Sequence, residues 1–542
     1  MPASAERDAL LVASGALQDG VPRAETEAAA LGDAGRDALA NASALLASTR
    51  RHALAAKLAE AASRGAPNAA ELRTRAETLA ALRPWEEARN QGDEAERLLR
   101  RLLVLAVNAP DPAKEIGALV SHRVPEGALR EAIVQGLPLP TSARPARGDE
   151  TMPPDVLLDV ALSTLEVARE GEPGHGLRLR VRFRFSPAGR GAAVYLVREG
   201  GALRVLATDR AWPALGAEIV RLAGAGDAAG AARWLAWARE DVPGLQGDPA
   251  SPAGILAALA RPGAPLDAAA ARRAGAALLA WADERGETLP LLAPSPGDDA
   301  AARLALALAR TEAARAAKRP DAALAAADDA LAQDPASRDA FAAKAWALRR
   351  LGRAAEVDRA ADAVLAQRPD DPEVLGLLAS SRLLSGDLDG AAHTFRRLID
   401  AGRATPPIYN DAAWLELFRD GATPLALDWA RRAVEGSPAG ERASQNTLAA
   451  LHAALGQAGE AREVFLRSIE GKDKLDPEDW YVFGRIAEAW GLDAAARTAY
   501  GRVEPSKVDG APDPSGPHEL ARRALARLGP APVPASAPAP RP

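Results

Sequence analysis

The chain has no cysteine among its 542 residues, and aromatic residues make up 4% of it. Without cysteine it can form neither a disulfide nor a thiolate nucleophile, and cysteine-ligated zinc and iron–sulfur sites are excluded. It also lacks any uncharged apolar run approaching the roughly 18 residues that a membrane-spanning helix needs. We therefore expect no membrane span, while the redox compartment stays open.

A secretory signal is also missing from the start of the sequence. Residues 1–18 show no basic start followed by a sustained apolar run, which a signal peptide requires. We expect a cytoplasmic protein by default. A longer natural N-terminus with a signal peptide would instead place it in the periplasm or outside the cell.

Charge and motifs exclude further classes. Lys and Arg number 67 against 73 Asp and Glu, a net charge of -6, so nucleic acid is not an expected partner. The six histidines are scattered singly, and neither a metal-binding His pair, a phosphate-binding loop nor a nucleophile elbow is present. We expect no cofactor, no metal and no catalytic site, and the sequence leaves the oligomeric state open.

What the chain has in abundance is alanine, with a hydrophobic fraction of 48%. Alanine loses no side-chain entropy in a helix, so this composition favours helices in close contact. Glycine then recurs at intervals of 34, 35, 35 and 35 residues, at Gly352, Gly386, Gly421, Gly456 and Gly491. We expect each glycine to follow a first helix and to turn the chain back with positive φ.

Each glycine is followed by a fixed pattern of small and large residues. Five positions on stand Val357, Ala391, Ala426, Ala461 and Ala496, and four further stand Ala361, Phe395, Ala430, Phe465 and Tyr500. The spacing of four places both sets on one face of a second helix. The last repeat also has Trp480, Phe483 and Gly484 in its first helix. This pattern resembles the tetratricopeptide repeat over about 304–505.

The resemblance implies a mainly α protein with a solenoid of helical hairpins. In the degenerate first unit, 304–337, Lys318 replaces the turn glycine, and the segment 409–414 is similar to units of long bacterial tetratricopeptide proteins. Trp414 stands where other units have a small residue. Either its helix is shifted by one residue or the contact between units is rebuilt, and we interpret it as a family variant rather than a binding feature.

Members of this family usually bind ligands along the concave surface lined by first helices. The resemblance places on that surface Trp346, Arg349, Arg350, Tyr409, Asn410, Asn446, Tyr481 and Arg485. Asparagine would bond a peptide backbone, and arginine would pair with acidic groups. The alternative is ordinary surface polarity and packing between repeats.

A second pattern interrupts the helices. Residues 177–185 alternate, with Leu177, Leu179, Val181, Phe183 and Phe185 on one face and Arg178, Arg180, Arg182 and Arg184 on the other. We expect a four-stranded antiparallel β-meander over 155–210, with a first strand within 158–169 and a hairpin about Gly200 and Gly201. The arginines could bind an anion or an acidic group, or be neutralised by Asp159, Glu166 or Glu170.

These patterns divide the chain. We expect a helical region at 1–137, as degenerate hairpins or a separate bundle; a linker at 138–154; the meander at 155–210; helical hairpins at 211–287; a linker at 288–303; the solenoid at 304–505; and at 506–542 a linker, a capping helix near 518–528 and a Pro/Ala-rich tail.

The sequence supports three hypotheses about function. The leading one is a non-catalytic scaffold that binds a peptide or protein partner along the groove of the solenoid. The second is an envelope-associated or secreted accessory protein whose β-meander has the specific function. The third is an enzyme with an unrecognised site in the N-terminal half.

Overall fold

The computed structural model describes residues 3–137, 153–184, 191–242, 248–260, 267–419, 421–438, 441–472, 474–508 and 511–529. Phe185, most of the predicted linker 138–154 and the predicted tail from 530 lie outside these ranges. The chain divides into two compact units. The first comprises Met1–Asp283 and Pro290–Leu292, and the second comprises Glu284–Leu289 and Ala293–Pro542.

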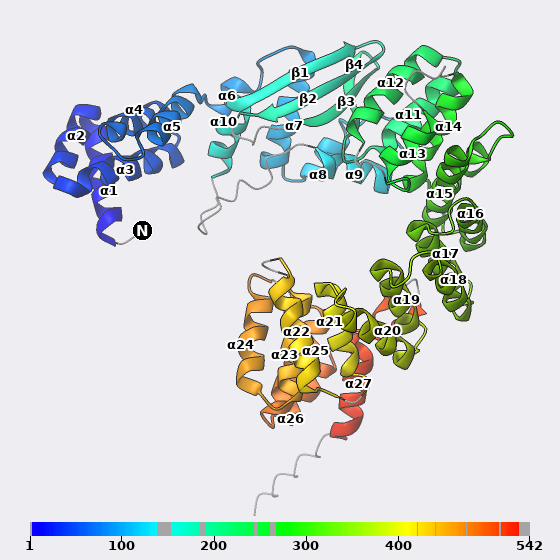
Figure 1. The fold of residues 1–542 in the computed structure, drawn as a ribbon. Coiled ribbons are helices and arrows are strands. Elements are labelled where there is room, and N and C mark those ends of the chain that lie inside the picture. Colours follow the sequence, from blue (N-terminus) through cyan, green and yellow to red (C-terminus); the bar gives the residue numbers. More distant parts are fainter. Residues whose placement is uncertain are drawn as a thin grey trace, which may run out of the picture. The chain divides into compact units, whose positions relative to one another are not determined.

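The first unit begins with a stack of helices around its own apolar core. Helices that are neighbours in sequence pack side by side (Figure 1), namely α1 (Ala3–Asp19), α2 (Val21–Ala30), α3 (Gly35–Ser48), α4 (His52–Ser63) and α5 (Ala69–Ala81), with a 3-10 turn, η1, at Gly32–Ala34. The predicted helical region 1–137 is therefore not uniform. Its first part is a stack of hairpins, whereas its later helices belong to another core.

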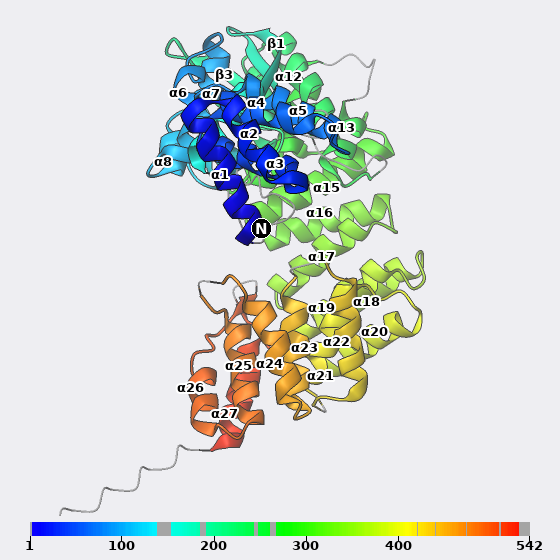
Figure 2. The ribbon, with the colours of Figure 1, turned by 90° about the vertical axis from the view of Figure 1, so that its left-hand side faces the viewer.

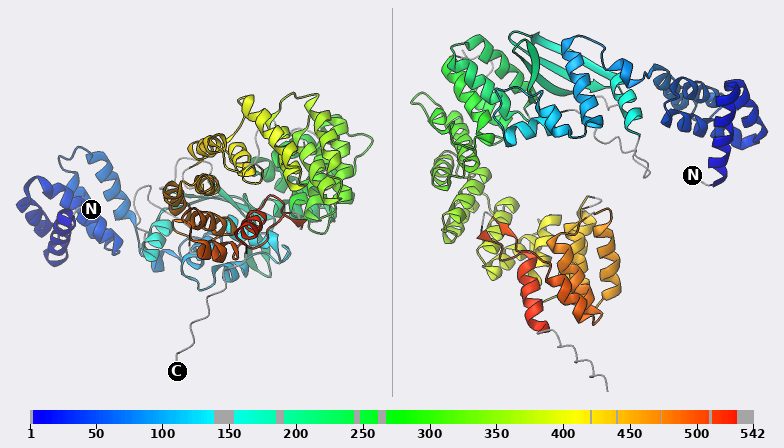
Figure 3. Two further views of the ribbon diagram at one scale, coloured as in Figure 1. Left: turned by 90° about the horizontal axis from the view of Figure 1, so that it is seen from below. Right: turned by 180° about the vertical axis from the view of Figure 1, so that it is seen from behind.

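That second core lies between helices and a sheet. It combines α7 (Glu94–Asn108), α8 (Pro112–Gly117) and α9 (Ala128–Gly136) with the apolar face of four strands, and the short α6 (Trp85–Ala88) precedes them. The strands β1 (Leu165–Glu172), β2 (Gly176–Phe183), β3 (Ala192–Glu199) and β4 (Ala202–Thr208) pair antiparallel in chain order, and the right-hand view of Figure 3 shows this sheet from behind. This confirms the predicted meander.

The tight turn between β3 and β4 forms as expected. Glu199 pairs with Ala202, which leaves a loop of Gly200 and Gly201, and these have φ angles of 56° and 83°. Two successive positive φ angles match the twist of a hairpin and favour glycine at both positions.

The first predicted strand is wrong in its upstream part. Residues from Pro154 to Thr164 form helix α10, and β1 starts only at Leu165. Leu165 pairs with Phe183, the last residue of β2, so the described ladder between β1 and β2 begins at Leu165. Pro154 at the start and Asp155 in the first turn are helix-starting signals, and they prevail over the apolar run.

The first unit ends with four helices and two 3-10 turns, namely α11 (Pro213–Gly224), α12 (Ala228–Asp241), α13 (Pro252–Leu259), α14 (Ala268–Leu279), η2 (Ala280–Ala282) and η3 (Leu289–Leu292). The first residue of η3, Leu289, belongs to the second unit. Gly216 of α11 lies so close to α14 that an added Cβ would be 2.5 Å from the carbonyl oxygen of Gly275. The absence of side chains at this crossing lets the two helices touch through their backbones.

The second unit is a solenoid of helical hairpins with tetratricopeptide-type pairs (Figure 2). The pairs are α15 (Ala300–Ala316) with α16 (Pro320–Gln333), α17 (Arg338–Arg350) with α18 (Ala355–Leu365), α19 (Pro372–Leu384) with α20 (Leu388–Asp400), α21 (Pro406–Glu416) with α22 (Pro424–Gly436), α23 (Ala443–Ala454) with α24 (Ala458–Ile469), and α25 (Pro477–Ala489) with α26 (Asp493–Tyr500). A small ribbon of β5 (Lys507–Val508) and β6 (Ala511–Pro512) and a last helix, α27 (Pro517–Leu528), follow. Helix α15 begins inside the predicted linker 288–303 because Asp299 accepts a hydrogen bond from the amide of Ala302 and caps it.

The turn glycine between paired helices has a positive φ in all five glycine-bearing repeats, although α21 ends five residues before its glycine and the other first helices end two residues before theirs. The φ angles are 72°, 81°, 85°, 76° and 72° at Gly352, Gly386, Gly421, Gly456 and Gly491, which confirms the predicted role of these glycines. In the first repeat of the solenoid, between α15 and α16, Lys318 has a φ of 55°. The turn therefore persists without glycine, at a conformational cost to the lysine.

A small residue marks the contact between the paired helices. Ala345, Ala379 and Ala449 are buried at this position, and at Gly484 an added Cβ would lie 2.4 Å from the Tyr500 ring. In α21 the buried small residue is Ala413, one position earlier than the repeat predicts. Its neighbour Trp414 is thereby turned away from the pair.

Candidate groove site

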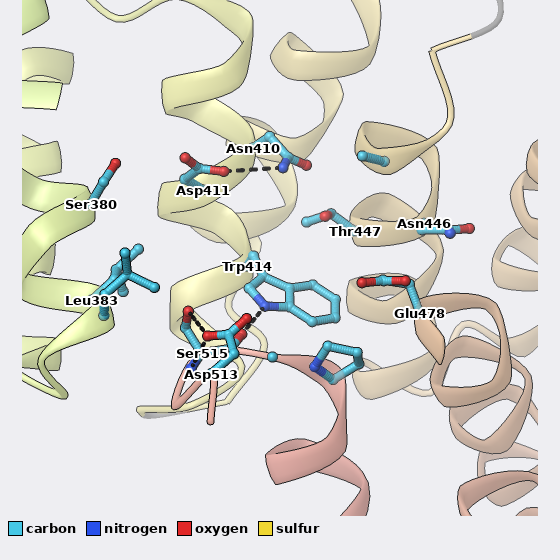
Figure 4. Close-up of a pocket in the computed structure, with 14 residues that line it drawn as sticks. Ser380, Leu383, Asn410, Asp411, Trp414, Asn446, Thr447, Glu478, Asp513 and Ser515 are labelled. Atoms are coloured by element: carbon cyan, nitrogen blue, oxygen red, sulfur yellow. Dashed lines mark hydrogen bonds between the residues drawn. The ribbon is translucent and has the colours of Figure 1, made fainter. Parts of the chain in front are cut away.

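A hollow of about 340 Å³ opens on the surface made by the first helices of four successive hairpins. Its residues come from α19, α21, α23 and α25 and from the segment before α27 (Figure 4). We call it the groove pocket, and it is lined by Ser380, Leu383, Leu384, Asn410, Asp411, Trp414, Ala443, Asn446, Thr447, Glu478, Asp513, Ser515, Gly516 and Pro517.

Trp414 lies at the centre of the groove pocket. Its indole Nε1 donates a hydrogen bond of 2.9 Å to the carbonyl oxygen of Ser515, and its ring packs edge-on against Tyr481, with centroids 5.7 Å apart. The helix is thus shifted by one residue, as one of the two predicted alternatives has it. Trp414 lines the pocket as a result, while its interpretation as a family variant rather than a binding feature stays a prediction.

Asn410 and Asp411 lie at one end of the pocket, one turn before Trp414 (Figure 4). The Asn410 Nδ2 donates to the Asp411 carboxylate over 3.4 Å, a long hydrogen bond. The buried Asn410 Oδ1 has no partner among the described residues. Burial raises the pKa of Asp411 to about 6, against the opposing effect of the Asn410 amide. Both side chains thus have acceptor capacity to spare.

Asn446 also lines the pocket, but its amide is committed to the interior. Its Nδ2 donates to Asp479 over 2.8 Å, and its Oδ1 accepts from the Ser468 hydroxyl over 2.7 Å. Lys472 donates to the same Asp479 over 2.6 Å. This network joins α23 to α25, so the Asn446 amide stabilises the stack of hairpins.

Tyr481 and Arg485 line a separate, smaller hollow of about 190 Å³ together with residues of α27. Tyr481 is 3% exposed, and burial raises its pKa to about 12. Arg485 is paired with Glu488 over 2.8 Å, and Arg527 of α27 reaches the same carboxylate over 2.7 Å. This part of the predicted binding surface is therefore covered by the chain itself.

Helix α27 overlaps the predicted capping helix 518–528 and does more than cover the last hairpin. It packs against α25 and α26, with Leu520, Ala521 and Ala524 buried in the same core as the hairpins. Its Arg523 also donates a hydrogen bond of 2.8 Å to the carbonyl oxygen of Phe418, just beyond α21. The C-terminal helix thus spans from the last hairpin back to an earlier one.

The remaining predicted partner-binding residues lie apart from the groove pocket. Trp346 is on α17 together with Arg349 and Arg350, and its ring lies under the guanidinium of Arg315, with 5.9 Å from the guanidinium carbon to the ring centroid. Tyr409 is on α21 and packs under Arg432 of α22. Of the eight predicted residues, the pocket brings together Asn410 and Asn446.

Asp411, Trp414 and Glu478 were not among the candidate binding residues predicted from the sequence, although they line the pocket. For Trp414 a signal existed, since a large aromatic residue interrupted a ladder of small ones. For the contribution of Asp513 and Ser515 no local signal exists, because these residues follow the last repeat and reach the pocket only through the packing of the C-terminal segment.

The arginine face of β2 is closed by acidic partners. Arg178, whose side chain is 6% exposed, pairs with Glu170, with Glu240 over 2.7 Å and with Asp241 over 3.2 Å. Arg180 also pairs with Asp241. Helix α12 covers this end of the sheet, because Trp237 lies under Arg178 and both α12 tryptophans pack on Tyr195.

Further along the same strand, Arg182 and Arg184 both reach Glu166, over 2.8 and 3.5 Å. Neutralisation by Glu166 and Glu170 therefore occurs as one prediction had it. The predicted role of Asp159 is wrong. This fully buried carboxylate faces the N-terminal stack instead, where it accepts hydrogen bonds of 2.8 Å from Arg50 and His52 and of 2.6 Å from the Trp85 amide.

Over the described ranges, His, Asp and Glu side chains do not come together in a group of three or more suited to a metal ion. Among the helices described here, each is too short or too polar to cross a bilayer.

Comparison with known proteins gives only distant structural likenesses. No family model matches the chain, and no curated protein matches it. Among solved structures, PilF of Pseudomonas aeruginosa is 16% identical with a TM-score of 0.30, over 39% of this chain and 94% of that one. The Cut9–Hcn1 hetero-tetramer of the APC/C is 12% identical with a TM-score of 0.32, over 96% of each chain. The P58(IPK) TPR domain is 14% identical with a TM-score of 0.18, over 58% of this chain and 98% of that one.

Proposed function

We propose that this protein is a non-catalytic scaffold that binds a partner polypeptide in the groove pocket. The observation that supports this most is that four successive first helices contribute to one hollow with an aromatic side chain at its centre. A partner segment lying across these helices would contact several hairpins at once. Its backbone N–H groups would find an acceptor at the Asn410 Oδ1, which lacks a partner within the described parts of the chain.

The open part of the surface is limited at one end. Residues of α27 fill the space next to Tyr481 and Arg485, so a partner would be held between the end of α19 and the start of α25. The rim there is apolar at Leu383 and Leu384 and polar at Thr447 and Glu478. Such a mixed rim suits an extended peptide, whose alternate side chains face opposite sides.

The β-meander supports the second hypothesis less well. Its arginines already have carboxylate partners on β1 and α12, so binding an anion there would require breaking these ion pairs. A new ligand would gain only the difference between its own contacts and those it displaces.

The test uses a matched pair of leucine substitutions in the full chain. Leu384→Arg places a long cation at the rim of the groove pocket, whereas Leu466→Arg places it on α24 at a side chain that is 46% exposed and outside the pocket. Affinity capture from the native cell, followed by quantitative mass spectrometry, should recover a stoichiometric partner with the parent chain and with Leu466→Arg. Recovery should fall at least about tenfold with Leu384→Arg, which corresponds to about 1.4 kcal/mol.

Two results would overturn the proposal. One is the recovery of no stoichiometric partner by the parent chain, together with no binding to a random peptide library. The other is a partner that both variants retain equally, since it would then bind elsewhere on the protein. Circular dichroism of the two variants shows that each keeps its helical content, so a loss of recovery reports on binding.

A further inference from the structure

We infer that the groove pocket selects a partner segment by a lysine or arginine side chain, which it holds between Asp411 and the Trp414 ring. This inference rests on the proposed function, because it names the chemistry of the segment that would occupy the same pocket. It reverses the expectation from the sequence, in which arginines of the solenoid pair with an acidic partner.

The first argument is the balance of charge around the pocket. Its lining includes the acidic residues Asp411, Glu478 and Asp513, and none of the described lining residues is Lys, Arg or His. A hollow with three carboxylates and no cation favours a positive group and repels a negative one.

The second argument comes from comparing these carboxylates with others in the same solenoid. Asp479 is paired with Lys472 over 2.6 Å, Glu416 with Arg396 and Arg419 over 3.2 Å each, and Glu488 with Arg485 and Arg527. Among the described residues, the Asn410 amide is the hydrogen-bond donor to Asp411, and its bond is long. Within the described parts of the chain, Asp411 is thus a partly buried acid without a basic partner.

The third argument is that the polar atoms of Asn410 and Asp411 with unused hydrogen-bonding capacity are acceptors. Asp411 has unused carboxylate lone pairs, and the Asn410 Oδ1 is a buried acceptor without a donor. A ligand that satisfies both must bring several N–H donors. An ammonium group has three donors and a guanidinium has five, with no acceptor in either, so both match what is missing.

Trp414 supplies the remaining feature. The hydrogen bond from its Nε1 to Ser515 fixes the orientation of the indole, and in Figure 4 the ring lies beside Asp513 and below Asp411. A cation over an indole face is attracted by the ring quadrupole. The aliphatic stem of Lys or Arg would meanwhile cover the ring and the side chain of Leu383.

A metal ion fits the pocket less well than an organic cation. The three acids come from α21, α25 and the segment before α27, and they do not form a group suited to a metal ion in the described structure. Metal coordination needs several oxygens within about 2.6 Å of one point. A side chain several bonds long can instead pass between carboxylates that are farther apart.

The test is a peptide array probed with the labelled full chain. Sets of peptides that differ at one position, as Arg, Lys, Gln or Glu, are compared between the parent, Asp411→Asn and Glu463→Gln. Asp411→Asn keeps the shape of the side chain and removes its charge, while Glu463 is an exposed acid of α24 outside the pocket. The selected peptides should contain Lys or Arg, and fluorescence anisotropy should show Asp411→Asn weakening them about tenfold or more.

The controls separate this inference from the proposed function. Peptides with Gln at the same position should lose less than about twofold on Asp411→Asn, and Glu463→Gln should change neither set. Selection of acidic peptides, or an unchanged affinity of Asp411→Asn for the basic ones, overturns the inference and leaves the proposed function standing. Failure of all peptides, with no partner recovered from the cell, overturns both.

Discussion

Asp241 in the first unit and Asp411 in the second are both carboxylates withdrawn from water, yet the fold treats them differently. The side chain of Asp241 is fully buried and accepts hydrogen bonds from Arg178, Arg180 and the Tyr195 hydroxyl. Asp411 accepts one long hydrogen bond over the described ranges, from the Asn410 amide. A charge that its own chain satisfies stabilises the fold, whereas one left unsatisfied is available to a ligand.

The largest expected effect on stability concerns Asp241, the carboxylate whose partners are supplied by its own chain. Asp241→Ala leaves two arginines and a tyrosine around an empty position, and breaking such a buried network costs about 3–5 kcal/mol. The neighbouring Glu240, whose side chain is 49% exposed, provides the matched control, because Glu240→Ala removes a partly solvated pair expected to contribute about 0–1 kcal/mol. Hydrogen exchange of the β2 and α12 amides, followed by mass spectrometry, measures both. Equal effects of the two variants would contradict the assigned role of Asp241.

The second prediction concerns Asp411, and its expected effect is present at neutral pH and absent at low pH. Its pKa is raised from 3.8 to about 6 in the folded chain, so the folded state binds this proton more tightly than the unfolded state does. Stability from this group is therefore present at low pH and is lost as the pH rises from about 4 to about 6. Asp411→Asn should stabilise α21 by up to about 3 kcal/mol at about pH 7.5 and have little effect near pH 3.5.

Hydrogen exchange of the α21 amides at the two pH values checks this difference. The other acids that line the pocket, Glu478 and Asp513, are unchanged in the variant, so their titration cancels in the comparison with the parent chain. A variant that is less stable than the parent at neutral pH would mean that Asp411 already has a partner that stabilises its charge. Greater stability together with weaker binding is the combination expected of a residue kept for its ligand.

The smallest expected effect concerns a turn. Lys318 holds a φ of 55° where the later units have glycine. The left-handed conformation costs an L-residue about 1–2 kcal/mol, and glycine loses about 0.5–1 kcal/mol more backbone entropy on folding. Lys318→Gly should therefore stabilise α15 and α16 by about 0.5–1 kcal/mol. The opposite type of substitution, Gly352→Ala, replaces a glycine of positive φ and should destabilise the hairpin of α17 and α18. Exchange rates of the amides in these helices measure both, and a loss of stability in Lys318→Gly would show that the lysine side chain has a compensating role.

The parts of the fold that were predictable are those set by residues close in sequence. The turn glycines at Gly386 and Gly456 follow from a period of about 34, and the hairpin at Gly200 follows from a local pair of glycines. The limits of local reasoning appear at α10, where an apolar run suits either a strand or a buried helix. The choice depended on where β2 ends, since Leu165 pairs with its last residue.

The candidate site was predictable to a smaller extent. Asn410 was identified from its place on a first helix, and it lines the groove pocket. Asn446 was placed on the same surface, but its amide bonds Asp479 and Ser468, on the next helices. Whether the amide of such a side chain is free depends on partners 22 and 33 residues away, and the repeat pattern does not specify these partners.

The sequence by itself determined the repeating hairpins and their positive-φ turns, the alternation of β2, and the absence of cysteine chemistry. Tertiary structure alone decided that α12 neutralises the arginine face, that Trp414 faces the groove, and that the C-terminal segment completes the pocket. The physical reason is range. Helix periodicity and turn geometry follow from steric preferences within a few residues, whereas the pairing of charges and the filling of a groove depend on segments brought together only when the whole unit packs.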